Sequence, residues 1–577
     1  MESPFDRPPI NVGASLADGQ VPNWEKDYLA TVSATTDEKA RLLDSLRTGE
    51  DPTIRDGVNL ALSRLVDPNA PQDPLGKTAF LVHDGTGTGK SFQAILAAKA
   101  IAFETGEPAL ITTRADLLPA LRRDLDRLGL DESQIAFVPI EQLGAFLKDA
   151  QKQQFSVAIV DEAQDCRIPE VRKFLDRIPA RRQLFFSATP FHNIDEFCYF
   201  SSKLTGKPIH QIKNQLNSAQ DLHLAVADQL KQIISAGGMV HREFPFFGNV
   251  KPAELLPLST ASREAETQLI DGYARLVQNR DLPQQRKLKE DLVTELNTAS
   301  DATKIDSILQ RTLELLSQNK KVMVAGDDLP VASRILKESD GLPKETSGFL
   351  SALRLAMAAQ GIECSMIRAF PPNSDAIPAL SGERAAIAAS NFEEMARFVD
   401  GAYRTNETGQ RLEVRGRDHK PIYSPSQTKV ILIPYQQVAG WPELNQRFPQ
   451  APEVSMVLTP TANADQFIQA IGRGSRRNSQ GPTDVHLVAN ESDADRRRLS
   501  QLLKGLQFIA ATGSPAIAPF LQLAADCLDR ASTQRAAQGQ RLIQLQRNQQ
   551  AGRNAPGETY RRIGVSAERR SGRNVSA

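Results

Sequence analysis

The chain has 577 residues, of which 40% are hydrophobic and 24% charged, and it carries 69 basic and 69 acidic side chains. This composition is typical of a soluble globular protein, and the length is sufficient for two or three domains. A chain without net charge is not a globally basic nucleic-acid coat protein, although a basic groove on its surface is compatible with this balance.

The four cysteines lie far apart in the sequence and form no CxxC pair. This spacing argues against a zinc finger or ribbon and indicates reduced thiols in an intracellular protein, cytoplasmic or nucleoid-associated. No run of about 18 apolar residues occurs, so we expect no membrane span. The N-terminal sequence MESPFDRPPI lacks the basic start and apolar core of a secretory signal, which leaves secretion into a host by another route open.

After a Pro- and Gly-rich start, which we expect to be disordered, residues 24–65 have a helical pattern. Short apolar runs then alternate with helical stretches as far as about residue 249. Runs of this length between helices indicate buried strands of a parallel sheet. The predicted strands are 78–84, 108–112, 135–140, 155–161 and 183–189.

A charged helical stretch over residues 260–319 precedes a second series of the same kind. An Arg-rich stretch over residues 401–427 within that series predicts a hairpin or a surface loop. Together the two series predict an α/β protein with two tandem domains on parallel sheets. The strands predicted for the second domain are 321–326, 362–367, 429–434, 454–460 and 485–489.

The C-terminal stretch from Arg530 contains ten arginines and two acidic residues, a net charge of +8 in a chain that is neutral as a whole. Such a composition cannot bury a core, so we expect a disordered tail. The predicted organisation is a partly disordered N-terminal segment 1–54, a first domain 55–250, a helical linker 251–319, a second domain 320–505, a helical segment 506–529 and the basic tail 530–577.

A glycine-rich loop, DGTGTGKS, follows the first predicted strand and opens a helix. Glycines let backbone N–H groups turn inward around phosphate oxygens, and the helix N-terminus adds a positive dipole end. Lys90 would reach the β- and γ-phosphates, and the Ser91 hydroxyl would ligate Mg²⁺. Asp84 stands where the strict phosphate-loop pattern has glycine, and the bland alternative is an ordinary glycine-rich turn. The predicted ATP-binding residues of this loop are Gly85, Thr86, Gly87, Thr88, Gly89, Lys90 and Ser91.

The sequence DEAQ, residues 161–164, directly follows a predicted buried strand. Acids at the carboxyl end of a parallel strand lie at the edge where such sheets bind ligands. Asp161 would hold Mg²⁺, and Glu162 would orient and polarise the attacking water. SATP, residues 187–190, follows another strand and could couple the nucleotide site to a cleft between domains. Taken singly, each motif is also compatible with a solvated strand end.

QAIGRGSRR, residues 469–477, lies in the second series. Arginines placed there would reach a γ-phosphate on the first domain only when the domains close, so hydrolysis would be linked to motion. The predicted catalytic residues are Glu162 from the first domain and Gln469, Arg473 and Arg476 from the second. The alternative for this block is a basic helix on a solvated face.

The order DGTGTGKS, DEAQ, SAT and QxxGRxxR resembles that of motifs I, II, III and VI in superfamily 2 helicases. Residues 109–124 resemble motif Ia of these proteins, and residues 429–441 resemble motif V, with Gly440 at its nucleotide-site glycine. The resemblance covers roughly residues 55–500. It implies two RecA-like domains that close on ATP and Mg²⁺.

Within the superfamily the chain is most similar to the Swi/Snf-like group and to the strawberry-notch proteins, whose loops also begin with Asp-Gly. The stretch 237–250, with an Arg followed by an acid, resembles their interdomain linker. Motif VI here contains GSRRN where that group usually has His-Arg-Ser-Asn, and Ser91 replaces the glycine that usually follows the lysine.

The resemblance implies an ATP-dependent helicase or translocase whose partner is nucleic acid, with DNA favoured over RNA and no membrane partner. Such motors hold mainly the phosphate backbone. The candidate contacts are Thr112, Thr113, Arg114, Thr459 and Thr461, each of which is also compatible with a turn or cap role. Two alternatives stay open. One is a nucleotide-sensing clamp that recruits partners with little turnover, and the other is a phosphate-loop NTPase outside the helicases.

Overall fold

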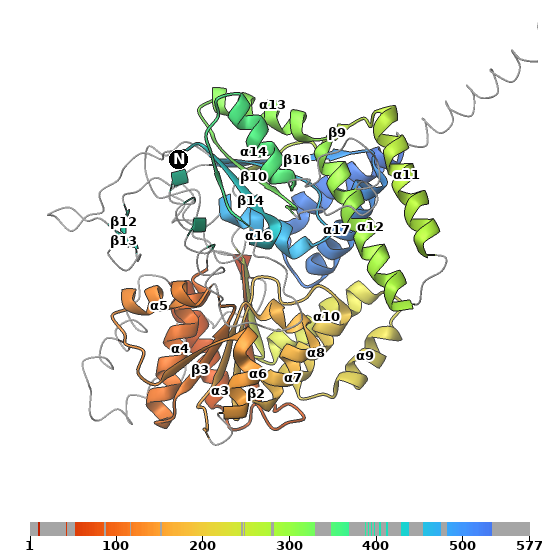
Figure 1. The fold of residues 1–577 in the computed structure, drawn as a ribbon. Helices are drawn as coiled ribbons and strands as arrows, with labels where there is room; N and C mark the ends of the chain where they lie inside the picture. The colour runs from red at the N-terminus through yellow and green to blue at the C-terminus, as the bar shows by residue number, and fades with distance from the viewer. Residues whose placement is uncertain are drawn as a thin grey trace, which may run out of the picture.

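Two α/β lobes, each built on its own parallel sheet, lie one above the other in the computed structural model (Figure 1). This arrangement confirms the predicted fold class, an α/β protein with two tandem domains on parallel sheets. The structure describes residues 10–11, 42, 52–85, 88–115, 117–149, 153–243, 246, 248–277, 282–328, 348–368, 387, 390–391, 394, 397–398, 403–405, 411–413, 428–437, 454–474 and 482–533.

The first sheet has the strand order β1-β7-β2-β6-β5-β3-β4, and all of its strands except β1 run parallel. Strand β6 lies between β2 and β5, so the carboxyl ends of these two strands are about 10 Å apart at one edge. The strands are β1 (Ile10–Asn11), β2 (Thr78–Asp84), β3 (Ala109–Thr113), β4 (Ile135–Pro139), β5 (Ala158–Asp161), β6 (Arg182–Phe186) and β7 (Met239–Glu243).

Helices cover both faces of this sheet, which explains why all seven residues of β2 are buried. Helix α4 follows Gly89, whose φ of 74° lies in the left-handed region that favours glycine, and Asn193 caps the N-terminus of α8. The helices of the first lobe are α3 (Pro52–Val66), α4 (Lys90–Thr105), α5 (Leu118–Arg127), α6 (Leu143–Asp149), α7 (Pro169–Arg177), α8 (Ile194–Thr205), α9 (Ile209–Asn217) and α10 (Leu222–Ser235).

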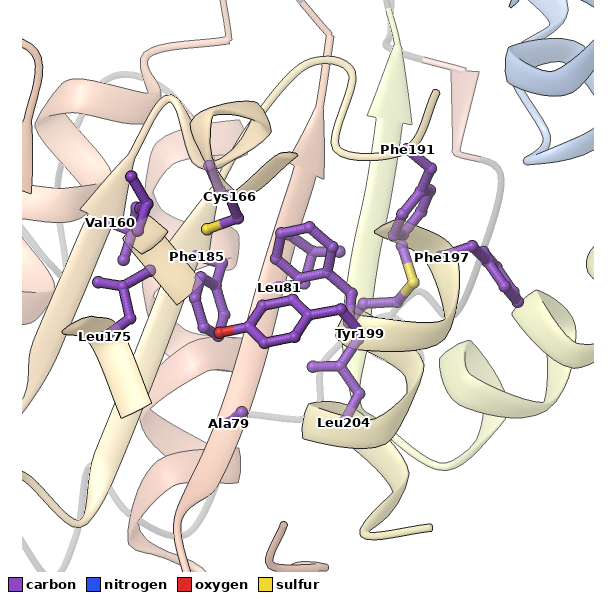
Figure 2. Packing of buried hydrophobic residues seen from close by; sticks show 14 of the residues in the cluster. Ala79, Leu81, Val160, Cys166, Leu175, Phe185, Phe191, Phe197, Tyr199 and Leu204 are labelled. Carbon is purple, nitrogen blue, oxygen red and sulfur yellow. The ribbon is translucent and has the colours of Figure 1, made fainter. Parts of the chain in front are cut away.

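Aromatic side chains dominate the packing between the first sheet and α8 (Figure 2). Phe185 on β6 meets Phe200 on α8 edge to face, with ring centroids 5.3 Å apart, and Phe200 in turn contacts Phe191 at 5.7 Å. Edge-to-face contacts add directional stabilisation to the burial of apolar area. Because Phe191 directly follows the SATP sequence, this packing fixes the backbone of that motif against the sheet.

The second sheet has the order β11-β14-β10-β15-β16-β8, with β9 also paired to β16, and every pair is parallel. A separate antiparallel pair, β12 and β13, confirms the predicted hairpin. The strands are β8 (Gly248–Val250), β9 (Glu254–Leu256), β10 (Lys321–Gly326), β11 (Cys364–Met366), β12 (Tyr403–Thr405), β13 (Arg411–Glu413), β14 (Val430–Pro434), β15 (Val454–Leu458) and β16 (Thr483–Asn490).

The helices of the second part include two long neighbours, α11 and α12, and α12 also packs on α17. The predicted helical stretch 260–319 consists of three helices. They are α11 (Thr260–Val277), α12 (Leu282–Ala302) and α13 (Ile305–Ser317), followed along the chain by α14 (Phe349–Ala359), α16 (Ala464–Gly474) and α17 (Asp493–Ala511). A further helix covers 518–533, and the rest of the predicted tail lies outside the described residues.

A cluster of buried charges attaches α12 to the second lobe. Arg498 of α17 is 1% exposed and donates to Asp301, at 3.0 Å, and to the Pro460 carbonyl oxygen at the end of β15. Lys304, which is fully buried, bonds both Asp301 and Asp495. Buried cations and carboxylates paired in this way hold a definite geometry, because breaking one pair leaves an unpaired charge in the interior.

The lobes are linked by a short segment, since β7 of the first sheet ends at Glu243 and β8 of the second begins at Gly248. They also touch directly: Phe508 of α17 belongs to the apolar cluster of the first lobe, and α17 contacts α10. The predicted domain boundaries stay predictions. All four cysteines are buried free thiols, and every described helix is too short or too polar to cross a bilayer.

Candidate nucleotide site and interlobe contact

The lysine of the predicted phosphate loop bonds to the first two residues of that loop. Lys90 Nζ donates to the carbonyl oxygens of Asp84, at 3.0 Å, and Gly85, at 2.9 Å. The Thr88 hydroxyl also donates to the Gly85 carbonyl, at 2.9 Å. The ammonium group is therefore held at the carboxyl end of β2, beside the first turn of α4. Thr86 and Gly87 of the predicted loop lie outside the described residues.

Asp84, the departure from the strict glycine pattern, is half of a buried ion pair. Arg242 on the neighbouring strand β7 donates to Asp84 Oδ1 from Nε at 3.0 Å and to Oδ2 from Nη2 at 2.5 Å. Arg242 also donates to the Thr53 carbonyl at 2.7 Å, and Gln93 of α4 donates to Asp84 Oδ2 at 3.2 Å. The first residue of the loop is thus bound to α4 and to the last strand before the interlobe segment, and Arg242 links this pair to α3.

The DEAQ sequence begins at the carboxyl end of β5, two strands from the loop. Burial and the neighbouring Glu162 raise the pKa of Asp161 to about 7, while the charge of Lys90 acts in the opposite direction. Glu162 has φ 59° and ψ 54°, a left-handed backbone that is uncommon for a residue with a side chain. Such conformations cluster at functional sites, where surrounding contacts maintain the strain.

A hydrogen-bonded chain leads from Glu162 to the second lobe, and we name Glu162, Gln164, Ser187, Thr189 and Asp465 the interlobe chain. Gln164 Nε2 donates to Glu162 Oε2 at 2.5 Å, and the Ser187 hydroxyl donates to Gln164 Oε1 at 2.5 Å. The Thr189 backbone N–H donates to Ser187 Oγ at 3.1 Å, and its hydroxyl donates to Asp465 Oδ1 on α16. Ser187 and Thr189 of SATP, which the sequence predicted to couple the nucleotide site to the other domain, are thus hydrogen-bonded to the DEAQ segment on one side and to α16 on the other.

The face of α16 that meets the first lobe also carries two of the predicted catalytic residues. Asp465, Gln469 and Arg473 are spaced by four residues, so they lie on one face of the helix. Gln469 Nε2 donates to Asp465 Oδ1 at 3.1 Å, and both Gln469 and Arg473 are 5% exposed. Arg476 and Gly440 lie outside the described residues.

The predicted Mg²⁺ ligands fit a cation that arrives with a nucleotide. Asp161 is a buried carboxyl group whose pKa is raised by burial and by the neighbouring Glu162, and Ser91 lies half-buried in the first turn of α4. The described residues contain no cluster of three or more His, Cys, Asp or Glu side chains suited to a metal. Mg²⁺ bound with phosphates needs only one or two protein ligands, because phosphate oxygens and water complete its shell.

The residues predicted to touch a nucleic-acid track are mostly buried. Thr112, Thr113 and Thr459 are fully buried, and Thr461, at 2% exposure, accepts a hydrogen bond from the Asn463 backbone N–H. Arg114 lies at the end of β3 and is half-buried. Of these five residues, Arg114 alone is partly exposed.

Sequence reasoning did not single out two residues that complete this site. Asp465 precedes Gln469 by one helical turn, a spacing that predicts a shared face. His192 directly follows SATPF; its Nδ1 lies 2.7 Å from Glu196 Oε2 and its Nε2 lies 3.7 Å from Asp465 Oδ2. No sequence pattern predicted that the two would meet, because the contact depends on how the lobes dock.

No protein-family model and no curated protein matches the sequence. Matching solved structures include the Sulfolobus solfataricus SWI2/SNF2 ATPase core in complex with dsDNA, 13% identical over 81% of this chain and 98% of that chain, with a TM-score of 0.27. The same core domain alone is 12% identical over 86% and 92%, with a TM-score of 0.31. S. cerevisiae Dbp5 bound to RNA and ADP BeF3 is 10% identical over 87% and 99%, with a TM-score of 0.39. Because the identities and TM-scores are this low, nothing about function is inferred from these structures.

Proposed function

We propose that the chain is an ATP-dependent nucleic-acid motor, a helicase or translocase of superfamily 2, which hydrolyses ATP between its two lobes. The observation that carries the proposal is the interlobe chain, because it joins the DEAQ acid Glu162 to the helix of the QxxGRxxR block in the other lobe. The order of the motifs in the sequence further suggests the Swi/Snf-like group and the strawberry-notch proteins within it.

In the proposed reaction, Lys90 and the loop N–H groups bind the β- and γ-phosphates. Ser91 and Asp161 would hold Mg²⁺, which neutralises charge developing on the phosphate oxygens. Glu162 orients a water molecule for attack on the γ-phosphorus, and the bond to the ADP leaving group breaks. Gln469, Arg473 and Arg476 act from the second lobe, so that hydrolysis requires the lobes to be in contact.

Nucleic acid should accelerate ATP turnover, because a track that bridges both lobes favours the closed state. The measurement is steady-state ATP hydrolysis at low salt with duplex DNA, single-stranded DNA, RNA and no nucleic acid. Higher turnover with at least one polymer is expected, falling as salt is raised. ATP binding without stimulation by any of the polymers would favour the nucleotide-sensing clamp instead.

Deletion of residues 534–577, which leaves the helix 518–533 whole, should weaken nucleic-acid binding without changing basal ATP turnover. The deleted segment carries nine arginines and two acidic residues, a net charge of +7, and every nucleotide-site motif precedes it. An arm of spaced arginines neutralises phosphates and reads charge rather than base edges, so the loss should be equal for all sequences. Binding titrations over a range of salt concentrations would check this, with a flatter salt dependence expected after deletion. Equal affinities and salt slopes for both proteins would leave the tail a solubilising segment.

A further inference from the structure

Asp465 lies where the two lobes meet, near the start of α16. Its carboxylate accepts a hydrogen bond from the Thr189 hydroxyl and one at 3.1 Å from Gln469 Nε2, and it lies 3.7 Å from His192 Nε2. Asn463 Oδ1 accepts from the Asp465 backbone N–H at 3.1 Å, which fixes the helix start. The residue is 4% exposed. A buried second-lobe carboxylate is therefore bound to two side chains of the first lobe.

We propose that Asp465 is a positioning residue for hydrolysis, which holds the interlobe chain from the second lobe so that Glu162 is aligned when the lobes touch. The inference rests on the proposed function. In the chain, each link depends on the next: Gln164 holds Glu162, Ser187 holds Gln164, and Thr189 contacts both Ser187 and Asp465. Removing Asp465 leaves the Thr189 hydroxyl without its second-lobe acceptor, so the turn that carries Ser187 and Thr189 loses its hydrogen bond to α16.

His192 supplies the positive charge at this contact. It lies between Glu196 of α8 and Asp465 of α16, while Asp165 and Arg167, from the turn after β5, act on Asp465 at longer range. Burial alone would lower the pKa of His192, but its two carboxylate partners outweigh burial and raise the pKa from 6.5 to about 9. The stability that this ion pair contributes is therefore fully present below about pH 6.5, and both the pair and its contribution are lost as pH rises through about 9.

The test compares ATP turnover for Asp465→Ala, Thr189→Val and the double variant. Each single change should lower kcat on the order of tenfold, as expected for coupling between sites, with KM for ATP within about twofold of wild type. The double variant should lose no more than Asp465→Ala alone, because that change already removes the link that Thr189→Val breaks. Thr189→Ser, which keeps the hydroxyl, should retain wild-type kcat. Gln466→Ala, on the next residue of α16, is the control for helix integrity.

The pH profile gives a second readout that a purely structural role would not move. Wild-type kcat should fall above about pH 9, and the Asp465→Ala protein should lack that alkaline fall. The proposal would be overturned if the Asp465→Ala protein had the kcat of the wild type, or if the losses of the two single variants added up in the double variant. The Glu162→Gln variant tests the proposed function independently of this outcome. An alkaline fall that is unchanged in Asp465→Ala would overturn the role of His192. A wild-type protein without turnover would overturn both proposals.

Discussion

Replacing Glu162 by glutamine should slow ATP hydrolysis by about 10²–10⁴-fold, the contribution typical of a positioned acid–base group. Glutamine keeps the size of the side chain and its acceptor oxygen but cannot polarise the attacking water as a carboxylate does. ATP binding should change little, because Lys90 and Asp161 are unaltered. Single-turnover hydrolysis and nucleotide titration separate the two effects.

Two companion variants sharpen this prediction. Lys90→Ala should weaken ATP binding itself, because it removes the ammonium group beside the loop carbonyls. Glu170→Gln changes an exposed acid on α7 of the same lobe and should behave as wild type. If Glu162→Gln turned over ATP at the wild-type rate, the assignment of the catalytic acid would be wrong.

The Arg242→Met variant should be less stable than wild type by about 3–5 kcal/mol, the cost of leaving one partner of a buried ion pair uncompensated. Arg242 and Asp84 are 5% and 0% exposed, and the arginine makes further hydrogen bonds to Thr53 and Gln93. Removing both charges in Asp84→Ala/Arg242→Met should recover part of the loss, because no unpaired carboxylate then remains in the interior.

The order of the unfolding midpoints in urea among the variants checks this prediction. Midpoints are compared in place of free energies of unfolding, because a two-lobed chain need not unfold in one step. Arg311→Met is the matched control, since Arg311 pairs with Glu254 and Glu314 at about one-third exposure. Partly exposed pairs contribute about 0–1 kcal/mol. A double variant as unstable as the sum of its singles would mean that the Asp84–Arg242 contact is not what stabilises this corner of the lobe.

The buried strands of both lobes could be predicted from the sequence because apolar runs such as 78–84 and 321–326 have the length of strands and lie between helices. Strand β7 could not, because His241 and Arg242 make it look like a surface segment. The burial of these polar residues is explained by partners far away in sequence. His241 stacks on His83 with ring centroids 3.8 Å apart, and Arg242 pairs with Asp84.

The individual residues of the candidate site could be predicted from the sequence, but the hydrogen bonds that connect them across the lobes could not. Lys90, Asp161 and Glu162 follow strands whose carboxyl ends share one edge, which the motif order implies. The predicted strand 183–189 ends three residues early, at Phe186, because Ser187 and Thr189 turn toward the other lobe. That turn depends on the docking of α16, which no local pattern encodes.

The most direct test of the two-lobe motor is ATP turnover by the full chain and by its Glu162→Gln variant, each with and without the polymer that it binds best. The proposed function predicts hydrolysis by the wild type, acceleration by nucleic acid, and loss of both in the variant with ATP still bound. ATP bound by the wild type without turnover, in the presence and absence of nucleic acid, would contradict it.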